Sequence, residues 1–80
     1  MFHVYVLRNP DGRLYIGSTS ELDARVRQHQ AGEAGWTRMR GPWELVHTEA
    51  YATLAEAVRR ERQLKGGRAN SELRRRLLDR

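Results

Sequence analysis

The chain has 80 residues, of which 39% are hydrophobic and 31% charged, a composition that suits one small globular domain spanning residues 1–80. It has no cysteine, which excludes a disulfide-stapled scaffold, a thiolate zinc site and a cysteine nucleophile. No apolar run approaches the roughly 18 residues of a membrane span, and the N-terminus lacks the basic segment of a secretion signal. We therefore expect a cytoplasmic protein with no membrane partner.

The net charge of +5 is unevenly distributed along the chain. From Arg59 onward nine basic residues stand against three acidic ones, whereas residues 1–58 carry six basic and seven acidic residues. A basic C-terminal third on a near-neutral body is typical of proteins that bind a phosphate-bearing partner. A solvated helix face that keeps the protein soluble explains the same charges equally well.

Residues 2–7 and 13–17 predict a β-hairpin. The first run is β-branched and aromatic, as strands usually are. Asn9-Pro10-Asp11-Gly12 has the composition of a tight turn, because proline fixes φ and glycine accepts a positive φ. The second strand returns through Leu14-Tyr15-Ile16, and we expect Gly17 to end it.

The next segment predicts a helix from about Glu21 to Ala31. Ser20 followed by Asp23 resembles a capping box, and Gly32 is the expected C-cap. Residues 32–42 contain three glycines and no periodicity, so we expect a long loop. Loops of this length in compact domains are usually functional or mobile.

Residues 43–51 alternate and predict a third strand, with Trp43, Leu45 and His47 on one face. Thr53 and Glu56 form a full capping box for the helix that follows.

That helix should run from Leu54 to about Lys65, where Gly66-Gly67 stops it. Ser71 can then cap a last short helix. The order ββα-β-αα describes a small α+β domain, in which helices pack on a three-stranded antiparallel sheet.

Polar residues interrupt the apolar faces of two predicted helices. Arg25 and His29 lie four residues apart on the face that Leu22 and Val26 define, and Glu61 falls in the middle of the apolar stripe that begins at Leu54 in the next helix. A carboxylate directed at apolar neighbours is costly unless it is paired or binds a cation. Local rules tend to be broken at functional positions, so these residues indicate a site.

Each of these residues also has a purely structural interpretation. Arg25 can extend to solvent from the edge of the stripe, and His29 can complement the C-terminus of its helix. Glu61 can form a buried ion pair with Arg25. As a set, however, an arginine, a histidine, a carboxylate and nearby phenols suit metal-assisted hydrolysis of a phosphodiester.

Three motifs resemble the GIY-YIG nuclease domain. They are Val4-Tyr5-Val6, then Leu14-Tyr15-Ile16-Gly17, and then Ser18-x-x-x-Leu22-x-x-Arg25-x-x-x-His29. The later Arg60–Lys65 segment resembles the part of that family that carries its metal-ligating glutamate. The resemblance covers essentially the whole chain, and it is strongest to stand-alone bacterial members related to the N-terminal incision domain of the excision-repair nuclease. The first motif departs from the family name, because Tyr5 takes the place of its tyrosine without the preceding glycine.

The resemblance implies a role for each residue. Glu61 would ligate one divalent cation, Mg²⁺ or Mn²⁺, and Arg25 would contact the scissile phosphate. Tyr5 and Tyr15 would flank the attacking water, with Tyr15 the preferred base, and His29 would assist catalysis. A phenol with a pKa of about 10 is a poor base at neutral pH unless a neighbouring cation lowers that pKa.

DNA is the expected partner, held mainly through its phosphates and therefore with little sequence specificity. The expected contacts are Arg59, Arg60, Arg62, Lys65, Arg68, Arg74, Arg75 and Arg76. Trp36 either stacks on an unpaired base or tethers the loop to the core. Trp43 and Leu78 are expected in the core, although the last helix can equally form the seam of a homodimer.

The leading hypothesis is a metal-dependent DNA endonuclease that acts in repair or on branched or single-stranded DNA. The alternative is a non-catalytic nucleic-acid-binding module of the same fold, and a third possibility is a subunit whose protein partner supplies the substrate contacts. Glu61 separates the first two hypotheses, because a binding module gains nothing from an inward-facing carboxylate that repels phosphate. A homodimer and a protein partner both stay open as sources of specificity.

Overall fold

The computed structural model describes residues 1–35, 37 and 39–78, which form three strands and three helices in the expected order. The elements are β1 (Phe2–Arg8), β2 (Leu14–Thr19), α1 (Leu22–Gln30), β3 (Glu44–Tyr51), α2 (Leu54–Leu64) and α3 (Gly67–Leu78). Both strand pairs are antiparallel and the sheet order is β2-β1-β3, so β1 is central. The predicted α+β class is confirmed.

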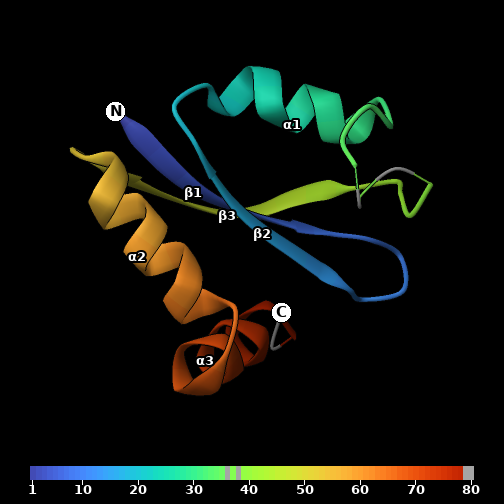
Figure 1. The fold of residues 1–80 in the computed structure, drawn as a ribbon. Helices are drawn as coiled ribbons and strands as arrows, with labels where there is room; N and C mark the ends of the chain where they lie inside the picture. The colour runs from blue at the N-terminus through green and yellow to red at the C-terminus, as the bar shows by residue number, and fades with distance from the viewer. Residues whose placement is uncertain (36, 38, 79–80) are drawn as a thin grey trace.

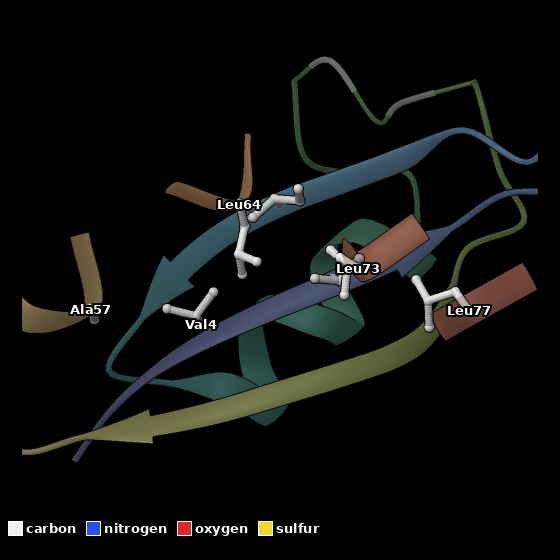
Figure 2. Close-up of a cluster of buried hydrophobic side chains, with 7 residues drawn as sticks. Val4, Ala57, Leu64, Leu73 and Leu77 are labelled. Atoms are coloured by element: carbon white, nitrogen blue, oxygen red, sulfur yellow. The ribbon is translucent and has the colours of Figure 1, made fainter. Parts of the chain in front are cut away.

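The central strand is buried on both faces, and each face carries its own hydrophobic cluster. Val4 and Val6 belong to a cluster with Leu64 of α2 and Leu73 of α3. Figure 2 shows Val4 on the same side of the sheet as these two leucines. The alternate residues of β1 point to the other face, which α1 covers (Figure 1). The sheet is therefore the middle of three layers, and side chains from α1 and from α2 approach it from opposite sides.

The hairpin turn follows the prediction, but β2 is longer than expected. Gly12 has a φ of +82°, and its backbone N–H donates to the carbonyl of Asn9 at 3.0 Å. β2 continues through Gly17 to Thr19 because residues up to Thr19 stay paired with β1. The expectation that Gly17 ends the strand is wrong, and this glycine lies inside the sheet.

The start of α1 differs from the prediction, and its C-cap is Ala31, one residue before the predicted Gly32. Ser20 does not cap the helix: Glu21 is the N-cap and has no side-chain capping bond, while Thr19 Oγ1 accepts from the Glu21 N–H at 2.9 Å. At the other end Gly32 has a φ of +75°, and its N–H donates to the carbonyl of His29 at 3.1 Å. Gly32 thus ends the helix in the left-handed conformation that glycine adopts without strain.

A bulge in the β1–β3 pairing changes the predicted faces of β3. Val6 faces His47 whereas Leu7 faces Leu45, so Val46 is the extra residue. Leu45 therefore shares the α1 face with Leu7, and His47 shares the α2 face with Val6. The prediction that these two β3 residues share a face is wrong, because strict alternation does not survive a bulge.

Thr53 is the N-cap of α2 as predicted, since its Oγ1 accepts from the Glu56 N–H at 3.2 Å and its hydroxyl also donates to Glu56 Oε1 at 2.9 Å. The predicted start of α3 is wrong. This helix begins at Gly67, and Ser71 lies within it and donates to the carbonyl of Gly67. Asn70 then closes the α2–α3 junction by donating to the carbonyl of Leu64 at 2.7 Å.

The apolar stripe of α2 is shorter than its sequence predicts. Leu54 is 52% exposed and lies at the first residue of the helix.

None of the helices in the part of the chain that the structure describes is long and apolar enough to cross a membrane.

A polar cluster fastens α2 to β3 on the edge of the sheet away from β2. Glu49 Oε1 accepts from Arg60 Nε at 2.8 Å and from the Tyr51 hydroxyl, while Glu49 Oε2 faces His47 Nε2 at 2.7 Å. Burial would raise the pKa of Glu49, but the hydrogen bonds from Arg60, Tyr51 and His47 outweigh burial and lower that pKa to about 2. The ionised form is therefore the one that the fold stabilises.

We expect Glu49→Gln to lower the free energy of unfolding at neutral pH by on the order of 2–3 kcal/mol. The contribution of Glu49 is complete above its ordinary pKa of 4.5 and is lost as the pH falls toward 2, so wild type and variant should converge over this interval. Chemical denaturation at several pH values measures both effects. Glu44→Gln is the matched control, because its carboxylate is 68% exposed in its pair with Arg8 and should contribute little. Equal losses in the two variants would contradict a special role for the Glu49 cluster.

Candidate active site

Tyr5 and Gly17 are directly paired across β1 and β2, on the face of the sheet that α1 covers. The Tyr5 ring lies over the glycine: a Cβ added to Gly17 would stand 2.6 Å from the Tyr5 hydroxyl oxygen and 2.8 Å from Cζ. Only glycine therefore leaves room for this phenol at its partner position. The Tyr5 side chain is 1% exposed, so its ring is fixed by packing.

α1 brings Arg25 and His29 onto the same face as the two tyrosines. The His29 ring centroid is 4.6 Å from that of Tyr15 and 5.6 Å from that of Tyr5. The Arg25 guanidinium interacts with both phenols and also donates to Gln28 Oε1 at 2.9 Å. Hydrogen bonding with Tyr5 raises the pKa of Arg25, so this cation stays charged next to the phenols.

His29 is almost fully buried, at 2% exposure, and both of its ring nitrogens have partners. Nε2 is 2.9 Å from the Tyr5 hydroxyl, and Nδ1 is 2.6 Å from Thr37 Oγ1. Burial and the positive charge of Arg25 lower the pKa of His29 below 6.5. The imidazole is therefore neutral near pH 7.

The Tyr5 phenol is protonated at neutral pH. Burial raises its pKa above 10.0, and the hydrogen bond from Arg25 offsets only part of that effect. A free phenolate is thus inaccessible at this pH, but the proton has a neutral imidazole within hydrogen-bonding distance.

Glu61 approaches from the opposite face of the sheet, on α2, and reaches the edge strand β2. Its Oε1 accepts from the Ser18 hydroxyl at 2.6 Å, and its Oε2 accepts from Lys65 Nζ at 2.6 Å. Burial tends to raise the pKa of Glu61, but the bonds from Lys65 and Ser18 outweigh it, and the net shift is downward. Glu61 is therefore an ionised carboxylate.

The two sides of the site meet at the dipeptide Gly17-Ser18. Gly17 carries the Tyr5 phenol on one face, and the next residue, Ser18, holds the Glu61 carboxylate from the other. The charge of Glu61 contributes to the raised pKa of Tyr5, which places the carboxylate within electrostatic range of the phenol. Within the described part of the chain, Arg25 and Glu61 bind other partners and not each other, so the structural interpretation of Glu61 as the ion-pair partner of Arg25 is wrong.

The residues present fit one divalent cation held by a single protein carboxylate. Among residues 1–35, 37 and 39–78, no group of three or more His, Asp or Glu side chains could enclose a metal ion. Glu61 is ionised, 19% exposed, and already has a cation, the Lys65 ammonium, at Oε2. Mg²⁺ commonly binds proteins through one or two carboxylates and takes its remaining ligands from water and substrate phosphate.

A groove of about 260 Å³ runs along β2 and includes Lys65, the partner of Glu61, in its lining. Its lining combines the β2 residues Leu14, Tyr15 and Ile16 with Lys65, Asn70 and Arg74. The groove therefore leads from one catalytic candidate, Tyr15, to the basic side chains that begin at the end of α2.

The basic residues that are predicted to contact phosphate differ in how firmly neighbouring side chains hold them. Arg60 is held by Glu49, so it is a poor candidate for binding phosphate. Arg68 pairs with Glu72 at 3.0 Å, and Arg74 donates to Asn70 at 3.0 Å, both on the exposed surface. Lys65 pairs with Glu61 at 2.6 Å, and the remaining predicted contacts, Arg59, Arg62, Arg75 and Arg76, are exposed.

Sequence reasoning gave no role in the site to Ser18, which opens the third motif, or to Thr37, although these residues bind Glu61 and His29. Ser18 stands beside Gly17, so its position was a usable signal, whereas Thr37 lies in the loop and gave none. Trp43 is in the core as predicted, at 5% exposure. The predictions for Trp36 and for the Leu78 side chain fall outside the residues that the structure describes.

Comparison with known proteins finds a match to the GIY-YIG catalytic domain over residues 1–76. A UPF0213 protein of Halobacterium salinarum is 46% identical over 66 residues, which cover 81% of this chain and 86% of that protein. A UPF0213 protein of Staphylococcus epidermidis is 43% identical over 78% of this chain and 77% of its own length. The solution NMR structure of a UPF0213 protein from Bacillus halodurans has a TM-score of 0.56 at 39% identity, and covers 91% of this chain and 81% of that one.

Gly17→Ala should disturb the site, because the added methyl overlaps the Tyr5 hydroxyl. We expect a loss of about 1–3 kcal/mol in the free energy of unfolding and a displaced Tyr5 ring. Denaturation and the NMR signals of the Tyr5 ring measure the two effects. Gly66→Ala is the control, since a Cβ there meets no atom within 4 Å. Unchanged Tyr5 signals in Gly17→Ala would show that the ring does not depend on this glycine.

Proposed function

Because the chain belongs to the GIY-YIG family, we propose that it is a metal-dependent endonuclease that hydrolyses phosphodiester bonds in DNA. The observation that carries this proposal is the meeting of the Tyr5 phenol and the Glu61 carboxylate on either side of Gly17-Ser18. This arrangement supports a reaction at a phosphate, because a phenol that would transfer a proton and a carboxylate that would ligate a cation lie on either side of one dipeptide.

Glu61 would hold one Mg²⁺ or Mn²⁺ ion at the oxygen that Lys65 now occupies. When bound, such an ion polarises a phosphate oxygen and lowers the pKa of its water ligands. Ser18 fixes the other carboxylate oxygen, so the Glu61 headgroup has one defined orientation. Lys65, once displaced, lies in the β2 groove and can neutralise a neighbouring phosphate.

Arg25 is the candidate for stabilising negative charge on the phosphate during the reaction. Its guanidinium is fixed by Gln28 and by the two phenols, and its raised pKa keeps it cationic. A fixed cation at a site of developing charge needs no reorganisation as the reaction proceeds.

We assign the proton-accepting phenol to Tyr5 in place of Tyr15, the residue that the sequence favoured. The Tyr5 hydroxyl lies 2.9 Å from His29 Nε2, which gives its proton a defined acceptor. In this scheme the attacking water gives a proton to the Tyr5 oxygen as the Tyr5 proton moves to His29 Nε2. The neutral, buried imidazole accepts it without a prior ionisation of the phenol.

The exposed cations of α2 and α3 support binding to the DNA backbone, and backbone contacts carry no sequence information. We therefore propose structure-selective substrates, single-stranded or branched DNA of the kind that repair produces. One observation favours the alternative of a non-catalytic binding module: Lys65 neutralises Glu61, so this carboxylate is tolerated without a metal ion.

Glu61→Gln should abolish Mg²⁺-dependent cleavage, because a neutral amide is a much weaker ligand for a hard cation. Affinity for DNA should not fall, since the variant loses a negative charge. Nicking of plasmid, single-stranded and branched DNA with Mg²⁺ or EDTA, beside fluorescence anisotropy, measures both properties. Glu72→Gln is the matched control, because Glu72 forms the same type of helical pair with Arg68 away from the site. Cleavage by purified Glu61→Gln at the wild-type rate would exclude this metal site.

Tyr5→Phe should lower the rate of cleavage by on the order of 10²–10⁴, whereas Tyr15→Phe should have a smaller effect. In the wild type the rate should be constant from neutral pH down past 6.5 and fall only as the pH drops through the lowered pKa of His29, since His29 must be neutral to accept the proton. This acid limb should disappear in Tyr5→Phe and persist in Tyr15→Phe. The reverse result in pH–rate profiles would return the role to Tyr15.

A further inference from the structure

Thr37 is a buried residue of the loop between α1 and β3, and its side chain contacts the imidazole that the proposed reaction uses. It is 1% exposed. Its Oγ1 lies 2.6 Å from His29 Nδ1 and 2.9 Å from the carbonyl oxygen of Ala34. Its backbone carbonyl accepts from Trp43 Nε1 at 2.9 Å, which anchors this part of the loop to the core.

The hydrogen bond from Thr37 to the Ala34 carbonyl favours one arrangement of the protons. A threonine hydroxyl has a single proton, and the Ala34 carbonyl can only accept, so that proton lies between Thr37 and Ala34. Thr37 Oγ1 must then accept from His29 Nδ1, which consequently carries the imidazole hydrogen. In a neutral ring the other nitrogen, Nε2, is bare, and it accepts from the Tyr5 hydroxyl.

We propose that Thr37 is a positioning residue that sets the tautomer of His29 and thereby the direction in which the Tyr5 proton moves. This inference deepens the proposed function and rests on it. With the opposite tautomer, Nε2 would carry the hydrogen and donate to the Tyr5 oxygen, so the imidazole could not take up the phenol proton. Thr37 thus acts through His29 and touches neither the phosphate nor the cation ligand Glu61.

The tautomer is directly observable in protein labelled with ¹⁵N-histidine, by long-range ¹H–¹⁵N correlation near neutral pH. We expect wild-type His29 to carry its hydrogen on Nδ1. His47 is an internal reference of the opposite kind, because its Nε2 faces the ionised Glu49 carboxylate at 2.7 Å and must carry the hydrogen there. Thr37→Val, which keeps the shape and removes the hydroxyl, should shift His29 toward the Nε2–H form. Thr37→Ser should retain the wild-type tautomer.

A wild-type His29 spectrum of the Nε2–H form would overturn the inference, as would a Thr37→Val spectrum equal to that of the wild type. The wild-type measurement decides the question even if Thr37→Val does not fold. In cleavage assays Thr37→Val should lower kcat by on the order of 10–100-fold with KM unchanged, and Thr37→Ser should restore most of the rate. A fall in KM and kcat together, or no rescue by serine, would contradict a positioning role.

The NMR spectra can be recorded whether or not the protein cleaves DNA. The proposed nuclease activity and the proposed role of Thr37 can therefore be refuted independently. If the wild type cuts none of the DNA substrates, the proposed nuclease activity is refuted. If the protein cleaves DNA but its His29 carries the hydrogen on Nε2, the role of Thr37 is refuted and the proposed nuclease activity stands.

Discussion

The placement of one phenol against one glycine organises this molecule. Tyr5 is the central residue of the central strand, and its ring fits only because its partner across the sheet, Gly17, has no side chain. The same close approach brings the hydroxyl to the edge strand, where Ser18 holds Glu61 from the far face. The sheet thus separates the Tyr5 phenol from Glu61, the candidate cation ligand, and the charge of Glu61 contributes to the raised pKa of Tyr5.

Both helical layers supply candidate site residues, and α2 also anchors the edge of the sheet away from β2. α1 supplies Arg25 and His29 to the face that holds the phenols, while α2 carries Glu61 to the β2 edge. The opposite edge of the sheet is locked by the saturated Glu49 cluster, in which Arg60, Tyr51 and His47 all donate to one ionised carboxylate. Glu61 differs from Glu49 in the property that matters for a ligand site: its second oxygen is bound by a half-exposed lysine that a metal ion can displace.

Much of the fold was predictable because local chemistry determines it. Thr53 caps α2 and Gly32 ends α1 in the left-handed conformation, as their residue types predict, and Arg25, His29 and Glu61 signalled a site because they broke an apolar stripe. The errors lie where distant parts of the chain decide. The bulge opposite Val6 depends on the β1–β3 register, and the burial of Thr37 and its contact with His29 depend on where the loop folds back.

The proposed chemistry requires a single cation site at Gly17-Ser18, between Glu61 and the phenols. Titration of ¹⁵N-labelled protein with paramagnetic Mn²⁺, read as broadening of backbone amide signals, tests for this site without any assumption about substrate. We expect Ser18 and Glu61 to broaden first, excess Mg²⁺ to reverse the effect, and the signal of Glu49 at the far edge to stay sharp. Broadening that begins at exposed acidic residues such as Glu72, with Ser18 unaffected, would contradict a cation site at this dipeptide.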